Sequence, residues 1–166
     1  MTALIIREAV PADRAAIRAV EEQAFGQASE ADLVERLVAD GDAVLELVAE
    51  IDGRVVGHVL FSRLQVEREG FAFAAVALAP LAVEPSWQGQ GIGSALVKEG
   101  HRLLAAAGEK LSVVLGDPGY YARLGYRRDL AEGFSSDYQG EALQALAWGE
   151  APRTGRLVYA PAFTAL

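Results

Sequence analysis

The chain has 166 residues, of which 52% are hydrophobic, and it carries a formal net charge of −8. This length suits a single domain spanning residues 1–166, and the excess of acidic residues argues against nucleic acid as a partner, because phosphate binding needs clustered lysine and arginine. The absence of cysteine excludes disulfides and thiolate metal sites and is usual in a reducing compartment, so we expect a cytoplasmic protein.

The amino-terminal part of the chain predicts a strand followed by a helix. Residues 4–9 form an apolar, strand-like segment, and Pro11 then opens a helix in which Ile17, Val20 and Ala24 repeat on one face. This segment lacks the basic region, apolar core and cleavage site of a signal peptide. We therefore expect no secretion signal here.

A second helix and a hairpin follow. Ser29, with acidic residues in the next turn, predicts a helix start, and Gly41 follows its last apolar residue. In residues 44–51 apolar side chains alternate with glutamates, which is typical of a strand with one face exposed to water. The Asp-Gly pair at residues 52–53 suits a tight turn, so residues 54–66 should return antiparallel.

The third strand of this meander leads into a glycine-rich segment. Residues 71–83 are nearly all apolar, which indicates a strand buried on both faces, and Pro80 within it predicts a bulge or splay. This run is too short to span a bilayer, so we expect no membrane interaction. Residues 88–93 read Gln-Gly-Gln-Gly-Ile-Gly and precede a helical pattern. Such a turn lets an anion approach the backbone amides at a helix N-terminus, and it predicts a site for a pyrophosphate group.

The remainder of the chain predicts shorter elements. Gly108 ends the helix, Asp117 starts a brief helix by capping it, and Gly125 ends that helix. The other segments are a buried strand at residues 111–115, a polar stretch at residues 132–140, and strands at residues 142–148 and 156–159.

Gln88, Gly91 and Gly93 match the acetyl-CoA signature of the GCN5-related N-acetyltransferase (GNAT) superfamily, which is Arg or Gln, two residues, Gly, one residue, then Gly or Ala. The segments at residues 81–85 and 120–126 also resemble this superfamily. Two others resemble, more narrowly, a bacterial subgroup of uncharacterised predicted acetyltransferases: residues 57–62 and 116–118. The resemblance covers roughly the whole chain. It implies an α/β fold of the α+β type, in which a mixed, mostly antiparallel sheet of six to seven strands is flanked by about four helices and splayed between two parallel strands.

The resemblance implies acetyl-CoA as co-substrate. The splayed strands would hold its pantetheine arm, and the glycine-rich loop would hold its pyrophosphate through backbone N–H groups. Because Gln88 replaces an arginine, the loop offers hydrogen bonds there without a full positive charge. The residues implied in coenzyme binding are Leu81, Ala82, Val83, Gln88, Gly89, Gln90, Gly91, Ile92, Gly93, Ser94, Gly116 and Tyr121.

The resemblance also implies direct attack of an amine on the acetyl thioester in a ternary complex. A backbone N–H of Leu81 or Val83 would stabilise the oxyanion, and Tyr121, which aligns with the family tyrosine near the sulfur, would protonate the departing thiolate. Tyr120 and Tyr126 fit ordinary half-buried aromatic residues better.

The general base is left open. An amine with a pKa of about 10.4 must lose a proton before it attacks. Glu22, Glu84 and His58 are candidates, and an ordered water relay is an equal alternative. His58 fits a structural role on a strand better than a base, and with two histidines and no cysteine we expect no transition-metal site.

The resemblance implies that the acceptor is a primary amine of a small molecule or a protein. The superfamily builds its acceptor pocket from variable segments, which we expect here at residues 22–32 and 132–141. The oligomeric state stays open between monomer and homodimer. A different class of function is a catalytically silent module that binds or senses acyl-CoA on the same fold. Release of CoA thiol with a panel of amines would favour the enzyme, whereas tight binding without turnover would favour the sensor.

A dinucleotide-binding turn is the main alternative for the glycine-rich segment. Gly89 and Gly91 begin its spacing, and Asp117 follows the next strand. However, Ser94 occupies the position of the third glycine, and residues 84–87 separate the strand from the glycines. A hairpin meander also precedes the motif in place of a βαβ unit, so we prefer the acetyl-CoA site.

Overall fold

The structure, a computed structural model, describes residues 3–165. The strands in this part of the chain are β1 (Leu4–Glu8), β2 (Ala43–Ile51), β3 (Arg54–Arg68), β4 (Phe71–Val83), β5 (Leu111–Leu115), β6 (Phe134–Ser135), β7 (Leu143–Ala147) and β8 (Gly155–Val158). The α-helices are α1 (Arg14–Phe25), α2 (Ser29–Ala39), α3 (Ile92–Ala106) and α4 (Pro118–Ala122). Short 3-10 helices lie at Pro11–Asp13, Pro85–Trp87 and Pro161–Ala165. None of the helices described is both long and apolar enough to cross a membrane.

The strands form one mixed sheet. Its order is β1-β2-β3-β4-β5-β7, with β8 paired to the second half of β3 and β6 paired to β8. Neighbouring strands run antiparallel except β4 with β5 and β6 with β8. The pairing of β4 with β5 stops at Leu78 and Val114, so the strands separate beyond these residues. This separation lies where the sequence predicts a splay.

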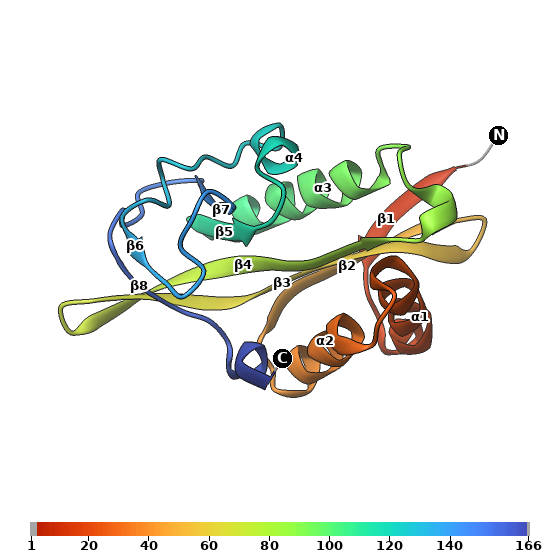
Figure 1. Ribbon diagram of the computed structural model, residues 1–166. Helices are drawn as coiled ribbons and strands as arrows, with labels where there is room; N and C mark the ends of the chain where they lie inside the picture. The colour runs from red at the N-terminus through yellow and green to blue at the C-terminus, as the bar shows by residue number, and fades with distance from the viewer. Residues whose placement is uncertain (1–2, 166) are drawn as a thin grey trace.

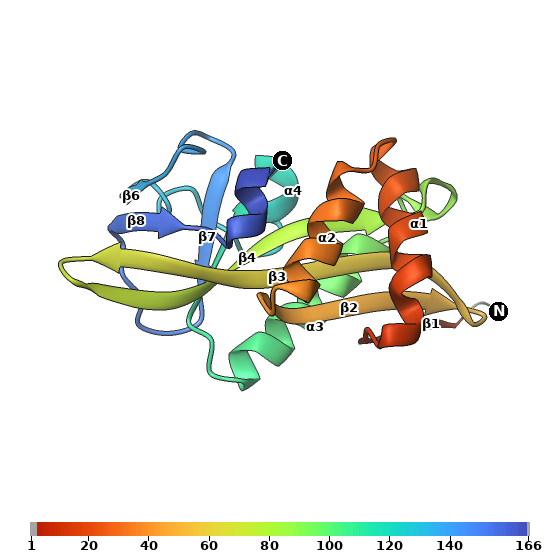
Figure 2. The same ribbon diagram turned by 90° about the horizontal axis from the view of Figure 1, so that it is seen from below.

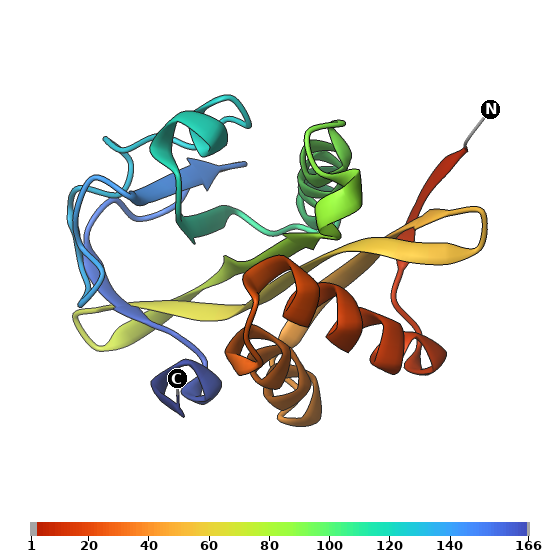
Figure 3. The same cartoon turned by 45° about the vertical axis from the view of Figure 1, so that its right-hand side comes forward.

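Helices cover both faces of the sheet (Figure 1). α1 and α2 lie on one face, which is turned toward the viewer in Figure 2, and α3 and the short α4 lie on the opposite face, as Figure 3 also shows. The layer under α1 and α2 buries Val34 and Leu60, and the layer under α3 buries Phe61 and Leu96. Each such side chain contributes about 1.5–3 kcal/mol when it leaves water, so apolar packing on both faces holds the splayed sheet in place.

The elements predicted from the sequence are confirmed, with ends that differ by a few residues. The predicted first helix begins as the 3-10 turn Pro11–Asp13 and continues as α1. The irregularity predicted at Pro80 is also confirmed, because the register of β3 against β4 shifts between Val59 and Phe61, opposite this segment. Gly108 and Gly125 both have a left-handed backbone where the sequence predicts helix ends.

Three details differ from the sequence-based expectations. The glutamate-bearing face of β2 is not exposed to water, because α1 and α2 cover it and Val48 on it is fully buried. The sheet has eight strands instead of six or seven, because Phe134–Ser135, inside the stretch predicted as polar, pairs with β8. A strand of two residues is too short to show the alternation of apolar and polar residues that predicts a strand. Ser29 is the first residue of α2, and its hydroxyl donates to Glu30 instead of capping the helix.

Candidate functional site

A cavity of about 280 Å³ lies at the glycine-rich loop. It is bounded by the end of β4, the loop, the first turn of α3 and Tyr120. Gly89 and Gly91 have φ angles of +77° and +83°, a conformation that glycine adopts without strain. Gly91 precedes the first residue of α3, and no side chain among the described residues caps this helix. The N–H groups of the first turn therefore point outward without an intrahelical acceptor, which is a suitable arrangement for an anion.

Two predicted coenzyme residues have different surroundings in the structure. The Gln88 side-chain amide donates to the Val83 carbonyl at 2.9 Å and ties the loop back to β4. The Ala82 side chain packs in the core on the α1 and α2 face, away from the loop cavity. The Ala82 side chain is therefore not available for coenzyme binding, and the Gln88 side-chain amide N–H group already has a partner within the protein.

A second cavity of about 500 Å³ lies at the splay between β4 and β5. Its lining includes Leu78 and Leu81 of β4 and Gly116, which follows β5. Leu81 and Tyr120 line both cavities, so the glycine-rich loop and the splay open next to each other. An elongated ligand with an anionic end could occupy both.

Tyr121 lines the splay cavity from α4. Its ring lies against Gly116, where an added Cβ atom would be 2.6 Å from the Tyr121 Cε2 atom. Burial, with smaller effects of Tyr120 and Asp117, raises the pKa of Tyr121 to about 12. Tyr121 therefore carries its proton at neutral pH and can donate it.

The neighbours of Tyr121 have structural contacts. Asp117 Oδ1 accepts from the backbone N–H groups of Gly119 and Tyr120, at 3.0 and 3.3 Å, and so caps α4. Tyr126 is buried, and its hydroxyl lies 2.7 Å from Ser112 Oγ and 3.0 Å from His101 Nε2. The capping role expected of Asp117 is thus observed, whereas Tyr126 is fully buried and not half-buried as expected.

The two leading candidates for a general base lie away from Tyr121. Glu22 is partly exposed on α1, where its carboxylate forms an ion pair with the Arg18 guanidinium at 3.4 Å. Glu84 binds the Arg54 guanidinium through both carboxylate oxygens, at 2.7 and 2.8 Å, and lines a separate cavity beside α1. Neither carboxylate lines the splay cavity.

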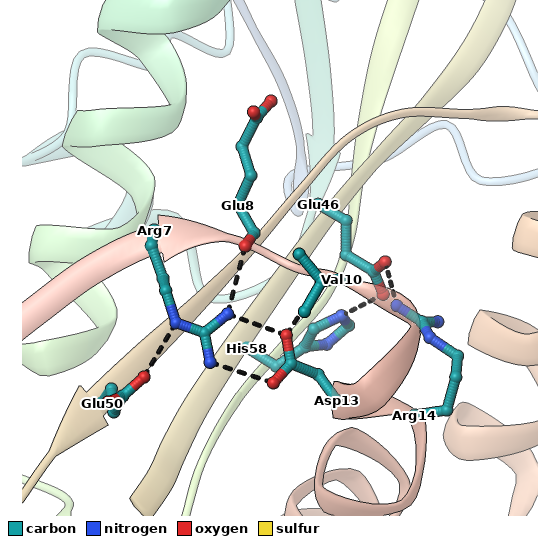
Figure 4. A network of polar contacts seen from close by, with 8 residues as sticks. All are labelled: Arg7, Glu8, Val10, Asp13, Arg14, Glu46, Glu50 and His58. Carbon is teal, nitrogen blue, oxygen red and sulfur yellow. Dashed lines mark hydrogen bonds and ion pairs between the residues drawn. The ribbon is translucent and has the colours of Figure 1, made fainter. Parts of the chain in front are cut away.

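A carboxylate that was not expected from the sequence, Glu21, is fully buried next to His58. Its Oε2 atom lies 2.7 Å from His58 Nδ1, and the other ring nitrogen lies 2.7 Å from Glu46 Oε2. Glu46 also pairs with Arg14, as Figure 4 shows. Burial opposes protonation of His58, but the hydrogen bonds to Glu21 and Glu46 outweigh it and raise the pKa of His58. These groups are not arranged as a metal site, and residues 3–165 contain no such arrangement elsewhere.

A second ion-pair network, also drawn in Figure 4, joins α1 to the sheet edge. The Arg7 guanidinium donates to both Asp13 oxygens, at 2.8 and 2.9 Å, and to Glu50 at 2.7 Å. The hydrogen bonds from Arg7 lower the pKa of Asp13 to about 2. Asp13 Oδ2 also accepts from the Val10 backbone N–H. This network holds the start of α1 against the sheet, and it does not reach the splay cavity.

Comparisons with known proteins agree with this arrangement. The family model described as Acetyltransferase (GNAT) domain matches residues 43–128, which include the glycine-rich loop and Tyr121. The uncharacterized N-acetyltransferase YjhQ of Escherichia coli (strain K12) is 42% identical over 116 residues, or 69% of this chain. That match covers 64% of YjhQ, so the chain spans less than two thirds of this relative. The uncharacterized N-acetyltransferase YhbS of the same strain is 40% identical over 74% of this chain and 73% of its own length.

Two solved structures extend the similarity to nearly the whole chain. The Escherichia coli GNAT family N-acetyltransferase YhbS in complex with CoA has a TM-score of 0.90 and 34% identity, covering 99% of this chain and 93% of that chain. A GNAT family acetyltransferase from Brucella melitensis in complex with acetyl-CoA has a TM-score of 0.83 and 37% identity, covering 97% and 98%.

Proposed function

The chain belongs to the GNAT acetyltransferase family, and on this basis we propose that it is an acetyl-CoA-dependent N-acetyltransferase acting on a primary amine of a small molecule or a protein. The observation that carries the proposal is that the glycine-rich loop and the splay cavity adjoin at Leu81 and Tyr120, with Tyr121 on the wall of the splay. One extended coenzyme could thus reach from the anion site to a proton donor.

In this proposal the coenzyme lies along both cavities. Backbone amides of residues 88–93, with Ser94 nearby, bind the pyrophosphate, because they combine free N–H groups with the positive end of the α3 dipole. The backbone of residues 81–83 and Gly116 binds the pantetheine arm at the splay. None of the described residues that line the loop cavity is a lysine or an arginine, so backbone donors are the main source of affinity there.

The reaction is direct transfer within a ternary complex. The neutral amine attacks the thioester carbonyl, a C–N bond forms, and a backbone N–H of Leu81 or Val83 stabilises the oxyanion. When the C–S bond breaks, Tyr121 gives its proton to the thiolate. The amine loses its proton through water, since neither Glu22 nor Glu84 lines the cavity that contains Tyr121. Steady release of CoA thiol in the presence of an amine tests this function, and tight acetyl-CoA binding without turnover across an amine panel would identify a binding module instead.

Gly91→Asp should weaken CoA binding by about 10- to 100-fold, because the carboxylate adds negative charge beside the predicted diphosphate site at an effective dielectric near 20. Calorimetric titration of CoA into both proteins measures the change. Gly91→Asn is the matched control, because it has nearly the same shape, tolerates the left-handed backbone and carries no charge. Affinities equal in the two variants and in the unmodified protein would place the diphosphate elsewhere.

A further inference from the structure

The splay cavity has a second wall that the proposed coenzyme site does not use. Four aromatic residues form it, and we refer to them as the aromatic wall: Phe25, Tyr138, Tyr159 and Phe163. Phe25 ends α1, while the other three come from the last part of the chain. The 3-10 helix Pro161–Ala165 lies beside α2 in both Figure 1 and Figure 2, and this position brings Phe163 to the cavity.

Three rings of the aromatic wall pack against one another in a row. The ring centroids of Tyr138 and Tyr159 are 5.4 Å apart at 83°, and those of Tyr159 and Phe163 are 5.4 Å apart at 59°. Phe25 and Tyr138 remain 42% and 41% exposed, and Leu115 on the same cavity is 47% exposed. Large apolar side chains left exposed around one cavity commonly mark a ligand site. The cavity therefore suits an apolar or aromatic body.

The charged residues around the cavity indicate which polar group the ligand carries. Among the described lining residues there are two carboxylates, Asp117 and Glu30, and no lysine, arginine or histidine. The side chain of Asp117 already caps α4. Glu30 accepts hydrogen bonds from Gln27 Nε2 and Ser29 Oγ, at 3.0 Å each, and forms no ion pair with a described arginine or lysine. A ligand carboxylate would lack a cationic partner here, whereas a ligand ammonium group would have an anionic partner in Glu30.

We propose that the acceptor is a primary amine carried by an apolar, preferably aromatic, body without a carboxylate. The inference rests on the proposed function and specifies its substrate class. The ring of the acceptor packs on the aromatic wall, and Glu30 attracts its ammonium group toward the acetyl thioester. The ammonium group loses one proton to water, and the neutral nitrogen then bonds to the acetyl carbon. The nitrogen loses its second proton to water as the C–S bond breaks, and the thiolate leaves with the proton of Tyr121, which solvent replaces.

Three matched amines test the proposal: phenethylamine, phenylalanine, which adds a carboxylate, and ethylamine, which lacks the ring. The kcat/KM for phenethylamine should exceed the kcat/KM for phenylalanine and the kcat/KM for ethylamine by at least about tenfold. Burial of the ring and an unpaired carboxylate each change the free energy of the transition state by enough to give this ratio. Tyr138→Ala, at an exposed position that should not affect folding, should reduce the preference over ethylamine. Glu30→Gln should raise KM for phenethylamine more than it lowers kcat. Glu35→Gln, a charge change elsewhere on α2, should alter neither.

The outcomes separate this inference from the proposed function. Turnover of all three amines with similar kcat/KM would overturn the substrate class and leave the enzyme activity standing. Calorimetric binding of phenethylamine to the CoA-bound protein without turnover of any amine would support the pocket and overturn the activity. Failure of phenethylamine both to bind and to react would overturn the inference. An unchanged preference in Tyr138→Ala would also contradict the role of the aromatic wall.

Discussion

Tyr121→Phe should lower kcat by about 10²- to 10⁴-fold, the usual contribution of a positioned general acid. The change removes one oxygen atom and keeps the ring, so its contact with Gly116 and its T-shaped packing against Tyr120 and Tyr126 should survive. The affinity for acetyl-CoA should therefore change little. CoA-thiol release under single-turnover conditions measures the chemical step without interference from product release, and calorimetry measures acetyl-CoA binding.

The pH dependence sharpens this expectation. Because burial raises the pKa of Tyr121 to about 12, the phenol keeps its proton throughout the range from pH 6 to pH 10. The unmodified enzyme should show no alkaline loss of rate from Tyr121 in that range, and the deficit of Tyr121→Phe should be the same at each pH. Full activity of the variant across this range would exclude Tyr121 as the proton donor.

Tyr126→Phe provides the matched control. It removes a hydroxyl from a neighbouring buried tyrosine that is bonded to Ser112 and His101 outside the splay cavity. We expect a loss of about 1 kcal/mol of stability from the broken hydrogen bonds. The rate should stay within a fewfold of the unmodified enzyme. Equal losses of rate in both variants would point to a general disturbance of packing.

The glycine-rich loop was predictable from the sequence because its residues are contiguous. The left-handed conformation of Gly89 and Gly91 and the uncapped start of α3 depend on local backbone preferences. The parallel strands and their splay needed the family resemblance, since periodicity does not specify which strands pair. Tyr159 and Phe163 reach the cavity only through the final path of the chain across the sheet. No local pattern in the sequence indicates that approach.

Glu21 shows a different reason for a missed residue. It lies four positions after Ile17 and one after Val20, on the face that the apolar pattern assigns to the core. Helical spacing therefore places Glu21 on the buried face and Glu22 away from it, although only Glu22 was considered as a site residue from the sequence. A carboxylate on a buried face needs a partner, and His58 supplies it from β3. The signal was present in the sequence, but the partner was 37 residues away and could be found only from the fold.

His58→Ala should lower the free energy of unfolding by about 3–5 kcal/mol, because removing one partner from a buried ion pair leaves the other charge uncompensated. Here two carboxylates, Glu21 and Glu46, would lose their shared partner, and only Glu46 would keep an arginine. Urea unfolding followed by circular dichroism measures the change. Ser62→Ala is the matched control on the same strand, since the Ser62 hydroxyl is fully buried without a described hydrogen-bond partner. Its removal should cost less than about 1 kcal/mol or be stabilising.

The charge state of His58 independently tests whether Glu21 and Glu46 stabilise its protonated form. Its pKa is raised above the unfolded value of about 6.5 by Glu21 on α1 and Glu46 on β2, so the folded protein binds this proton more tightly than the unfolded chain does. This contribution is complete below pH 6.5 and is lost as the pH rises through the folded pKa, at about 1.4 kcal/mol per pH unit. NMR of the imidazole should show that both ring nitrogens keep their protons to a higher pH in the folded protein than in the unfolded chain. A ring that titrates near pH 6.5, together with a small effect of His58→Ala, would mean that the two carboxylates do not hold it as a cation.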